Sequence, residues 1–272
     1  MKERAVEIRR ITQKRPDIFL LTVRSAALAN QARPGQFLHV KTDECTTILR
    51  RPLSIHRREK QDLSLLVKVR GRGTRALLRR APGERLNVIG PLGNGFTLSP
   101  FPDGGTTMLI AGGIGVAPLV FLAQRLTGTA KRPSTGRKIA LIGARTRGEV
   151  LCAPEFRRRG FTVKKATEDG SAGRKGSVIE LARDLLAARG DARPLRIFAC
   201  GPEQMFFRLR AAINELCPEP ERVRCQVSFE QFMGCGVGVC CACAIPTRQG
   251  YKKVCKDGPV FSLHELKERG TE

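Results

Sequence analysis

Residues Cys235 to Cys243 read CGVGVCCAC, and a further cysteine follows at Cys255. Four residues separate Cys235 from Cys240, two separate Cys240 from Cys243, and eleven more precede Cys255. This is the spacing C-x4-C-x2-C…C, typical of a loop that holds a 2Fe–2S cluster and takes its fourth thiolate from farther along the chain. The spacing therefore predicts that Cys235, Cys240, Cys243 and Cys255 are metal ligands.

The two glycines of this loop fit the same interpretation. Gly236 and Gly238 permit positive φ, and without a Cβ they let backbone N–H groups approach the sulfides. Two other interpretations stay open here, a structural zinc site and a pair of disulfides. Zinc sites usually draw cysteines from two separate knuckles, whereas three of these cysteines share one loop, which favours the cluster.

Composition indicates a globular protein with room for two modest domains and a small appendage, since it has 272 residues and 41% hydrophobic content. The first residues, MKERAVEIRR, contain no apolar segment of the secretory type, and most of the cysteines crowd the C-terminal part. We therefore expect a cytoplasmic protein. The apolar stretch Met108–Ala123 is interrupted by glycines and a proline, which favours strand, turn and helix over a membrane span.

The formal net charge is +24, which raises the possibility of a nucleic-acid partner. However, the cations are scattered along the chain, and one Tyr and no Trp leave little aromatic surface for stacking on bases. We expect no nucleic-acid partner. A surface that attracts anionic cofactors or an acidic protein, or a general basic bias of the host proteome, explains the charge with fewer assumptions.

Hydrophobic periodicity divides the chain into parts. Short β-rich runs separated by Pro/Gly turns predict a small antiparallel barrel in the first hundred residues, and they lie at Ile18–Val23, Gln36–Val40 and Leu63–Val69. From Thr106 onward, apolar strands alternate with helical stretches, which predicts a parallel sheet; these strands lie at Thr107–Ala111, Ile139–Gly143, Phe161–Lys165 and Leu195–Cys200. A loop is expected over Thr127–Lys138. We predict three domains, at 1–100, 101–218 and 219–272.

One helix of the α/β part is marked at both ends. Ser177 and Glu180 form a capping box, an apolar stripe follows, and Gly190 is placed to end the helix.

The β part contains two candidate flavin-binding motifs. In Arg50–Ile55, the extended sequence RRPLSI lets Arg51 pair with a pyrophosphate and Ser54 bond a flavin ring atom. GRGT at Gly71–Thr74 precedes a short helical stretch, Arg75–Arg80, and has the composition of a phosphate cradle. Alone, each motif is better explained as ordinary structure, RRPLSI as a solvated strand end and GRGT as a capped loop. Together in one barrel they gain weight, with GPLGNGF at Gly90–Phe96 closing the barrel.

The α/β part contains two further glycine motifs at strand ends. AGGIGVAP at Ala111–Pro118 follows the first strand and opens a helix, while Cys200-Gly201-Pro202 follows a later strand and precedes a helix near Glu203. Neither is the GxGxxG fingerprint. Both lie at the carboxyl edge of the predicted sheet, where open α/β sheets bind ligands.

The order of these motifs covers most of the chain, from about Pro34 to Phe261. It resembles the electron-transfer subunit of NAD-dependent (class B) dihydroorotate dehydrogenase, within the ferredoxin–NADP reductase superfamily. The motifs that carry the resemblance are RRPLSI, GRGT, GPLGNGF, AGGIGVAP, TEDGSAGRKG, ACGP, CGVGVCCAC and VCKDGPVF.

The resemblance implies cofactors and site residues. For FAD these are Arg51, Pro52, Leu53, Ser54, Gly71, Gly73 and Thr74. For NAD they are Gly112, Gly113, Gly115, Pro118, Cys200, Gly201 and Pro202. For the 2Fe–2S cluster they are Cys235, Cys240, Cys243 and Cys255.

Some residues depart from the superfamily pattern. Leu53 stands where an aromatic ring usually lies against the flavin, so it offers only apolar packing. Glu168 and Ala172 differ from the commoner DDGSYG form. Cys241 is an extra thiol expected to point away from the cluster. The three histidines, His39, His56 and His264, are isolated in sequence, and we assign them no catalytic role.

The resemblance also implies an electron relay in pyrimidine biosynthesis. An FMN-containing catalytic subunit would oxidise dihydroorotate, and electrons would pass through the cluster and FAD to NAD within a hetero-oligomer, a heterotetramer. Service to another partner (ferredoxin, a sulfide dehydrogenase or a soluble hydrogenase) stays open, as does a basic, zinc-stabilised RNA-binding module. Arg145 and Arg147 could favour NADP by holding a 2′-phosphate; the resemblance favours NAD.

Overall fold

A computed structural model describes residues 3–42, 47–128, 136–189, 193–217, 219 and 223–268. Contacts divide the chain into two units, each built from several segments. The first unit comprises Met1–Phe96, Gln231–Ile245 and Tyr251–Pro259, and the second comprises Thr97–Glu230, Pro246–Gly250 and Val260–Glu272. No helix in the described ranges is both long and apolar enough to cross a membrane.

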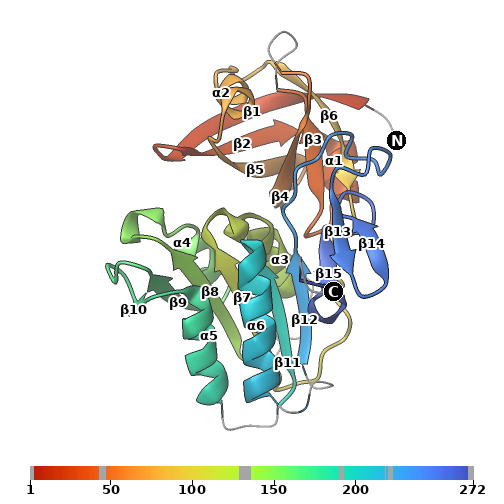
Figure 1. Ribbon diagram of the computed structural model, residues 1–272. Helices are drawn as coiled ribbons and strands as arrows, with labels where there is room; N and C mark the ends of the chain where they lie inside the picture. The colour runs from red at the N-terminus through yellow and green to blue at the C-terminus, as the bar shows by residue number, and fades with distance from the viewer. Residues whose placement is uncertain are drawn as a thin grey trace. The chain divides into compact units, whose positions relative to one another are not determined.

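The first unit contains a closed antiparallel barrel with the strand order β1-β2-β5-β4-β3-β6 (Figure 1). Its strands are β1 Glu3–Arg15, β2 Ile18–Arg24, β3 Phe37–Val40, β4 Arg51–Glu59, β5 Asp62–Lys68 and β6 Arg85–Leu92. Alternate residues of each strand point into the barrel, where Leu, Ile and Val side chains fill the interior. The predicted barrel is confirmed.

Two short helices connect barrel strands. Ser25 caps α1, Ala26–Gln31, by accepting a hydrogen bond from the N–H of Leu28. The other helix, α2, spans Arg72–Leu78 and so begins three residues before the predicted stretch. The prediction was wrong here because the glycine loop itself forms the first turn of the helix.

The second unit contains a seven-stranded sheet with the order β10-β9-β8-β7-β11-β12-β15. All neighbouring strands are parallel except β12 and β15. The strands are β7 Thr106–Gly112, β8 Lys138–Ala144, β9 Thr162–Thr167, β10 Arg174–Lys175, β11 Leu195–Cys200, β12 Val223–Ser228 and β15 Val260–Ser262. The predicted parallel α/β sheet is confirmed, with strand ends shifted by one or two residues.

Helices cover both faces of this sheet (Figure 1). The chain moves outward from β7 to β9 through α3, Val116–Gly128, and α4, Ala153–Arg157, and returns through α5, Val178–Ala187, and α6, Glu203–Leu216. Because crossovers between parallel strands are right-handed, the two directions place these helices on opposite faces. Short 3₁₀ turns complete the unit at η1 Gly113–Gly115, η2 Arg147–Glu149 and η4 Leu263–Glu265.

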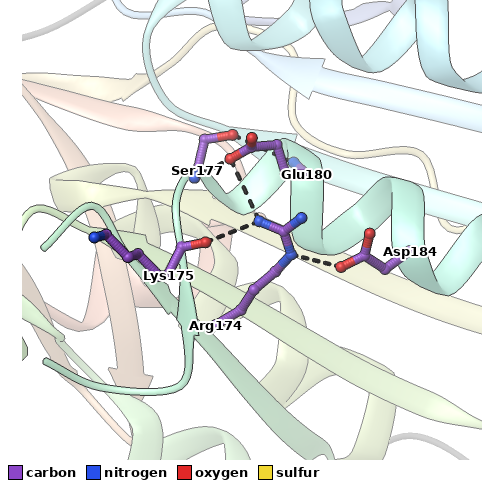
Figure 2. Close-up of polar contacts among 5 residues, drawn as sticks. All are labelled: Arg174, Lys175, Ser177, Glu180 and Asp184. Atoms are coloured by element: carbon purple, nitrogen blue, oxygen red, sulfur yellow. Dashed lines mark hydrogen bonds and ion pairs between the residues drawn. The ribbon is translucent and has the colours of Figure 1, made fainter. Parts of the chain in front are cut away.

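The capping box of α5 is confirmed in detail (Figure 2). The Glu180 carboxylate accepts from the N–H of Ser177 at 2.6 Å, and the Ser177 hydroxyl accepts from the N–H of Glu180 at 3.3 Å. Arg174 donates through Nε to Asp184 at 2.5 Å and through Nη1 to the carbonyl of Lys175. This network fixes the turn between β10 and α5. The predicted C-cap, Gly190, lies outside the described residues, as does most of the predicted loop Thr127–Lys138.

The cysteine-rich part is distributed over both units. Strands β12 and β15 extend the sheet of the second unit, whereas the cysteine loop and residues 251–259 group with the barrel. A small hairpin of β13, Ala244–Thr247, and β14, Gly250–Lys253, joins these segments. The division of the chain at residues 100 and 218 into three domains stays a prediction.

Candidate functional site

The four predicted cluster cysteines form a loop and a second segment of the first unit. Cys243 and Cys255 are 2% and 3% exposed, Cys235 is half-buried and Cys240 is exposed. The extra thiol, Cys241, is also exposed, and its Sγ lies 3.8 Å from the carbonyl oxygen of Val239. The described cysteines are all free thiols.

Backbone N–H groups converge on the sulfur of Cys235. The N–H groups of Val237, Val239 and Cys240 each donate to Cys235 Sγ at 3.4 Å. Burial acts to raise the pKa of this thiol, but hydrogen bonds from Cys240, Val237 and Val239 outweigh it and lower the pKa to about 6. A cysteine surrounded by such donors is prepared to act as a thiolate ligand.

The other two predicted ligands, Cys243 and Cys255, form a buried pair. The N–H of Cys255 donates to Cys243 Sγ at 3.4 Å. Burial, the hydrogen bond to Cys243 and the charge of Cys243 raise the pKa of Cys255 to about 12. A thiol of this kind deprotonates when a metal takes the place of its proton, because the ion's charge dominates the site.

The cysteines are arranged in two pairs. Cys235 and Cys240 exchange backbone-to-sulfur hydrogen bonds, and Cys243 pairs with Cys255. Over the part of the chain that the structure describes, no three or more His, Cys, Asp or Glu side chains are placed to hold a metal ion together. Two pairs fit a 2Fe–2S cluster, where each iron takes two thiolates, better than a single zinc ion, which needs four ligands around one centre.

The two loop glycines are required by backbone conformation and by close contact. Gly236 has φ +70° and Gly238 has φ +86°, both in the left-handed region. A Cβ on Gly236 would lie 2.4 Å from Nδ1 of His39, and one on Gly238 would lie 2.9 Å from Cδ of Lys256. The loop is therefore pressed against the barrel strand β3 and against the segment that contains Cys255.

The motif at Gly90–Phe96 binds the segment that contains Cys255 to the barrel. The N–H of Asn94 donates to the carbonyl of Gly258 at 2.6 Å, and its side-chain amide donates to the carbonyls of Lys256 and Asp257. Sequence reasoning assigned this motif only to closure of the barrel and missed its second role. The signal was present, because an Asn between two glycines offers side-chain donors at a turn.

The predicted flavin residues come together at the start of β4 and at α2. A Cβ on Gly73 would lie 2.9 Å from Nε and Nη2 of Arg51, so the guanidinium lies directly over this glycine. Arg51 also donates through Nη1 to the carbonyl of Leu49 at 2.7 Å. The Arg51 guanidinium is thereby held against the glycine loop, in a position suited to bidentate recognition of a phosphate.

Strand alternation separates the remaining flavin residues. Leu53 shares the face of Arg51 and is buried, whereas Pro52 and Ser54 point to the opposite face. The Thr74 hydroxyl accepts from the N–H groups of Arg70 and Gly71 and donates to the carbonyl of Gly71. It is engaged within its own loop, so its contribution to a phosphate site is to shape the backbone.

The two glycine motifs of the α/β unit lie directly against each other at the edge of the sheet. Strands β7 and β11 are neighbours, and a Cβ on Gly112 would lie 2.9 Å from Cδ of Pro202. A Cβ on Gly115 would lie 2.3 Å from the carbonyl oxygen of Cys200. Gly201 is equally close to Gly112, with 3.1 Å between its added Cβ and the Cα of Gly112. The structure thus brings these predicted residues together.

The remaining predicted residues of this edge shape the turn. Gly113 has φ +56° and open space on its Cβ side, and Pro118 lies in the first turn of α3. Burial, and then the charge of Glu230, raise the pKa of the Cys200 thiol, while a hydrogen bond with Ser228 lowers it. The Cys200 thiol is therefore neutral, which suits contact with an apolar ring rather than nucleophilic chemistry.

Arg145 and Arg147 lie beyond the end of β8 and are both engaged. Arg145 forms a bidentate ion pair with Glu149, with distances of 3.1 and 2.5 Å. Arg147 donates from its backbone N–H to the Ser171 hydroxyl and from Nε to the Ser171 carbonyl. The carboxylate of Asp169 accepts from the same serine. Glu149 thus neutralises Arg145, which leaves this cation less suited to hold a 2′-phosphate.

Comparison with known proteins supports the interpretation of the chain as an iron–sulfur oxidoreductase subunit. A family model described as the iron–sulfur cluster binding domain of dihydroorotate dehydrogenase B matches residues 230–267. A solved structure of an NADH-dependent reduced ferredoxin–NADP oxidoreductase, studied for flavin-based electron bifurcation, superposes with a TM-score of 0.80 at 28% identity. It covers 97% of this chain and 90% of that one.

Curated relatives extend the match to almost the full length. The chain is 39% identical over 253 residues to "Dihydroorotate dehydrogenase B (NAD(+)), electron transfer subunit" of Desulforamulus reducens, covering 90% of this chain and 91% of the relative. The protein of the same description from Bacillus caldolyticus is 39% identical over 252 residues, with the same shares covered. The chain belongs to the family of electron transfer subunits of dihydroorotate dehydrogenase B (NAD(+)).

Proposed function

We propose that this chain carries electrons to NAD from a partner flavoprotein that oxidises dihydroorotate. The electrons pass through a 2Fe–2S cluster, held by Cys235, Cys240, Cys243 and Cys255, and through a bound FAD. The reaction belongs to de novo pyrimidine biosynthesis in the cytoplasm. The observation that supports it best is the pairing of four thiols, three from one loop and one from the segment 251–259, in the same unit as the barrel with the flavin motifs. When bound, FAD would convert between hydride transfer, which moves two electrons, and the transfer of single electrons that a 2Fe–2S cluster supports.

The chain's own residues perform binding and orientation. The N–H groups directed at Cys235 compensate the negative charge of a loaded cluster, as does the cation Lys253, which donates to the carbonyl of Gly238 at 2.8 Å. Neither the residues predicted to bind FAD nor those predicted to bind NAD include an acid–base pair. Substrate oxidation needs a base, and we therefore assign it to the partner, an FMN-containing catalytic subunit.

Arg51 is proposed to hold the FAD pyrophosphate. Replacing Arg51 by lysine removes the planar fork but keeps the charge. FAD affinity is expected to fall roughly 10- to 100-fold, equivalent to about 1.5–3 kcal/mol for hydrogen bonds to a charged group. The measurement is fluorescence titration of the deflavinated protein with FAD.

The matched control is Arg58→Lys on the same strand, where the side chain bonds the amide oxygen of Asn30. The control should bind FAD as the unmodified protein does. Equal affinity for the Arg51 variant would show that this guanidinium does not contact the cofactor.

NAD preference is proposed to depend on the Arg145–Glu149 pair. Glu149→Gln leaves the cation Arg145 without its counter-charge, so the ratio of kcat/KM for NADPH to that for NADH is expected to rise roughly two- to fivefold. Adding Arg145→Gln should cancel the gain. A ratio that stays constant in both variants would place Arg145 away from the dinucleotide.

The partner is proposed to dock near the cysteine loop. Phe232 is 90% exposed and Val239 is 78% exposed within the loop segment, and Tyr251 is 81% exposed at the start of β14. Large apolar side chains that are this exposed are typical of protein contacts. The family description names a subunit, which implies a catalytic partner.

The deciding experiment combines a spectrum with two assays. The purified chain should be red-brown with flavin absorbance, reduce ferricyanide with NADH, and leave dihydroorotate unreacted. Co-expression with the dihydroorotate-oxidising flavoprotein should yield a complex that reduces NAD. Copurification with a ferredoxin, sulfide dehydrogenase or hydrogenase instead would overturn the choice of partner. A colourless zinc protein with salt-dependent RNA affinity would overturn the relay itself.

A further inference from the structure

His39 is a buried histidine with no hydrogen-bond partner. Its side chain is 0% exposed, and neither Nδ1 nor Nε2 makes a hydrogen bond. Leaving a buried polar group without a partner is unfavourable by about 1–3 kcal/mol, and such groups in native structures usually have a reason. The ring therefore indicates a partner that the polypeptide alone does not supply.

Strand alternation directs the ring at the cluster loop. Leu38 faces the interior of the barrel, since its Cδ2 would lie 2.6 Å from a Cβ on Gly90. His39 points the other way, and its Nδ1 would lie 2.4 Å from a Cβ on Gly236, which directly follows the ligand Cys235. The His39 ring thus lies directly against the turn formed by Cys235 and Gly236.

An imidazole ring carries at least one N–H donor whether it is neutral or protonated. Because neither ring nitrogen of His39 makes a hydrogen bond and Nδ1 lies against the loop at Gly236, the ring can offer a donor to a group bound there.

We propose that His39 is a positioning residue for the iron–sulfur cluster, and that its N–H donates a hydrogen bond to a sulfur at the Cys235 end of the loaded cluster. The inference rests on the proposed function, because it requires the cluster to be present. Reduction adds negative charge to the sulfurs, and a donor stabilises that charge, so the bond raises the reduction potential. His39 also joins the loop to β3, which pairs along one edge with β4, the strand of the predicted flavin motif.

The test uses two substitutions of nearly equal shape. Asparagine places an N–H close to the position of Nδ1, whereas leucine fills the same space without a donor. His39→Leu is expected to shift the midpoint potential of the cluster downward and to change the electron paramagnetic resonance signal of its reduced form. His39→Asn should restore both. Iron and sulfide content are measured in parallel, and Phe37→Leu, on the same face of β3, controls for lost packing.

The possible outcomes distinguish a failure of the His39 hydrogen bond from a failure of the proposed function. Wild-type protein without iron would overturn the proposed function. Wild-type protein with a cluster, but with unchanged or equally lowered potentials in both His39 variants, would overturn only the role of the N–H. Should neither variant fold, pulsed magnetic resonance of wild-type protein labelled with ¹⁵N-histidine decides. Coupling of the reduced cluster to a histidine nitrogen supports the hydrogen bond, and its absence refutes it.

Discussion

Replacing Cys243 by serine is expected to remove the iron–sulfur cluster. Cys243 is 2% exposed and its sulfur accepts from the N–H of Cys255, so the substitution removes a thiolate from a buried site. Changes around a metal site can already weaken binding by ~100-fold, and loss of a ligand should exceed that. Iron content should fall to background, and electron transfer from the catalytic partner to NAD should cease. NADH-dependent reduction of ferricyanide, which needs only the flavin, should persist.

The chain provides a matched control two residues away. Cys241 has a φ of +59° and an exposed side chain. Its sulfur lies near the carbonyl oxygen of Val239. Cys241→Ser should retain iron, colour and transfer to NAD at wild-type levels. Retention of a full cluster in the Cys243 variant, or its loss in the Cys241 variant, would contradict the ligand assignment.

Gly115→Ala should have the largest effect on the dinucleotide side. The added methyl would meet the Cys200 carbonyl oxygen at 2.3 Å, its carbon at 2.5 Å and the Gly201 nitrogen at 2.8 Å. All three are backbone atoms, so they cannot rotate aside, and the two glycine motifs must move apart. Overpacking of this kind is destabilising by roughly 1–3 kcal/mol or more. A shift of about 1 Å at a binding edge can reduce kcat/KM for NADH by ~100-fold.

The test compares thermal unfolding, NADH kinetics and cluster content. Gly128→Ala is the control, because Gly128 ends α3 and an added Cβ would meet nothing within 4 Å. That substitution should leave NADH kinetics unchanged and shift stability by no more than about 1 kcal/mol in the favourable direction. The Gly115 variant should still bind the cluster, whose ligands belong to the other unit. Normal NADH kinetics in this variant would exclude the glycine edge as the dinucleotide site.

Much of the architecture could be predicted because its signals are local. Strands β2, β3 and β5 follow from runs of apolar and β-branched residues between turns, and the capping box of α5 follows from Ser177 and Glu180. The prediction of four ligands rests on spacing alone, since a tight loop can present three thiolates to one cluster only at certain intervals. The predicted start of α2 was late because a glycine loop resembles a turn until its hydrogen bonds are known.

The amino-acid sequence by itself indicated a barrel before an α/β sheet and glycine motifs at strand ends, and it predicted the four cluster ligands. Only the tertiary structure decided which of these motifs touch. Asn94 bonds the carbonyl of Lys256 across 162 positions of sequence, and His39 lies under Gly236. Such contacts depend on the path of the whole chain rather than on a local pattern. For that reason a histidine that looks isolated in the sequence lies, in the folded barrel, directly against the cysteine loop.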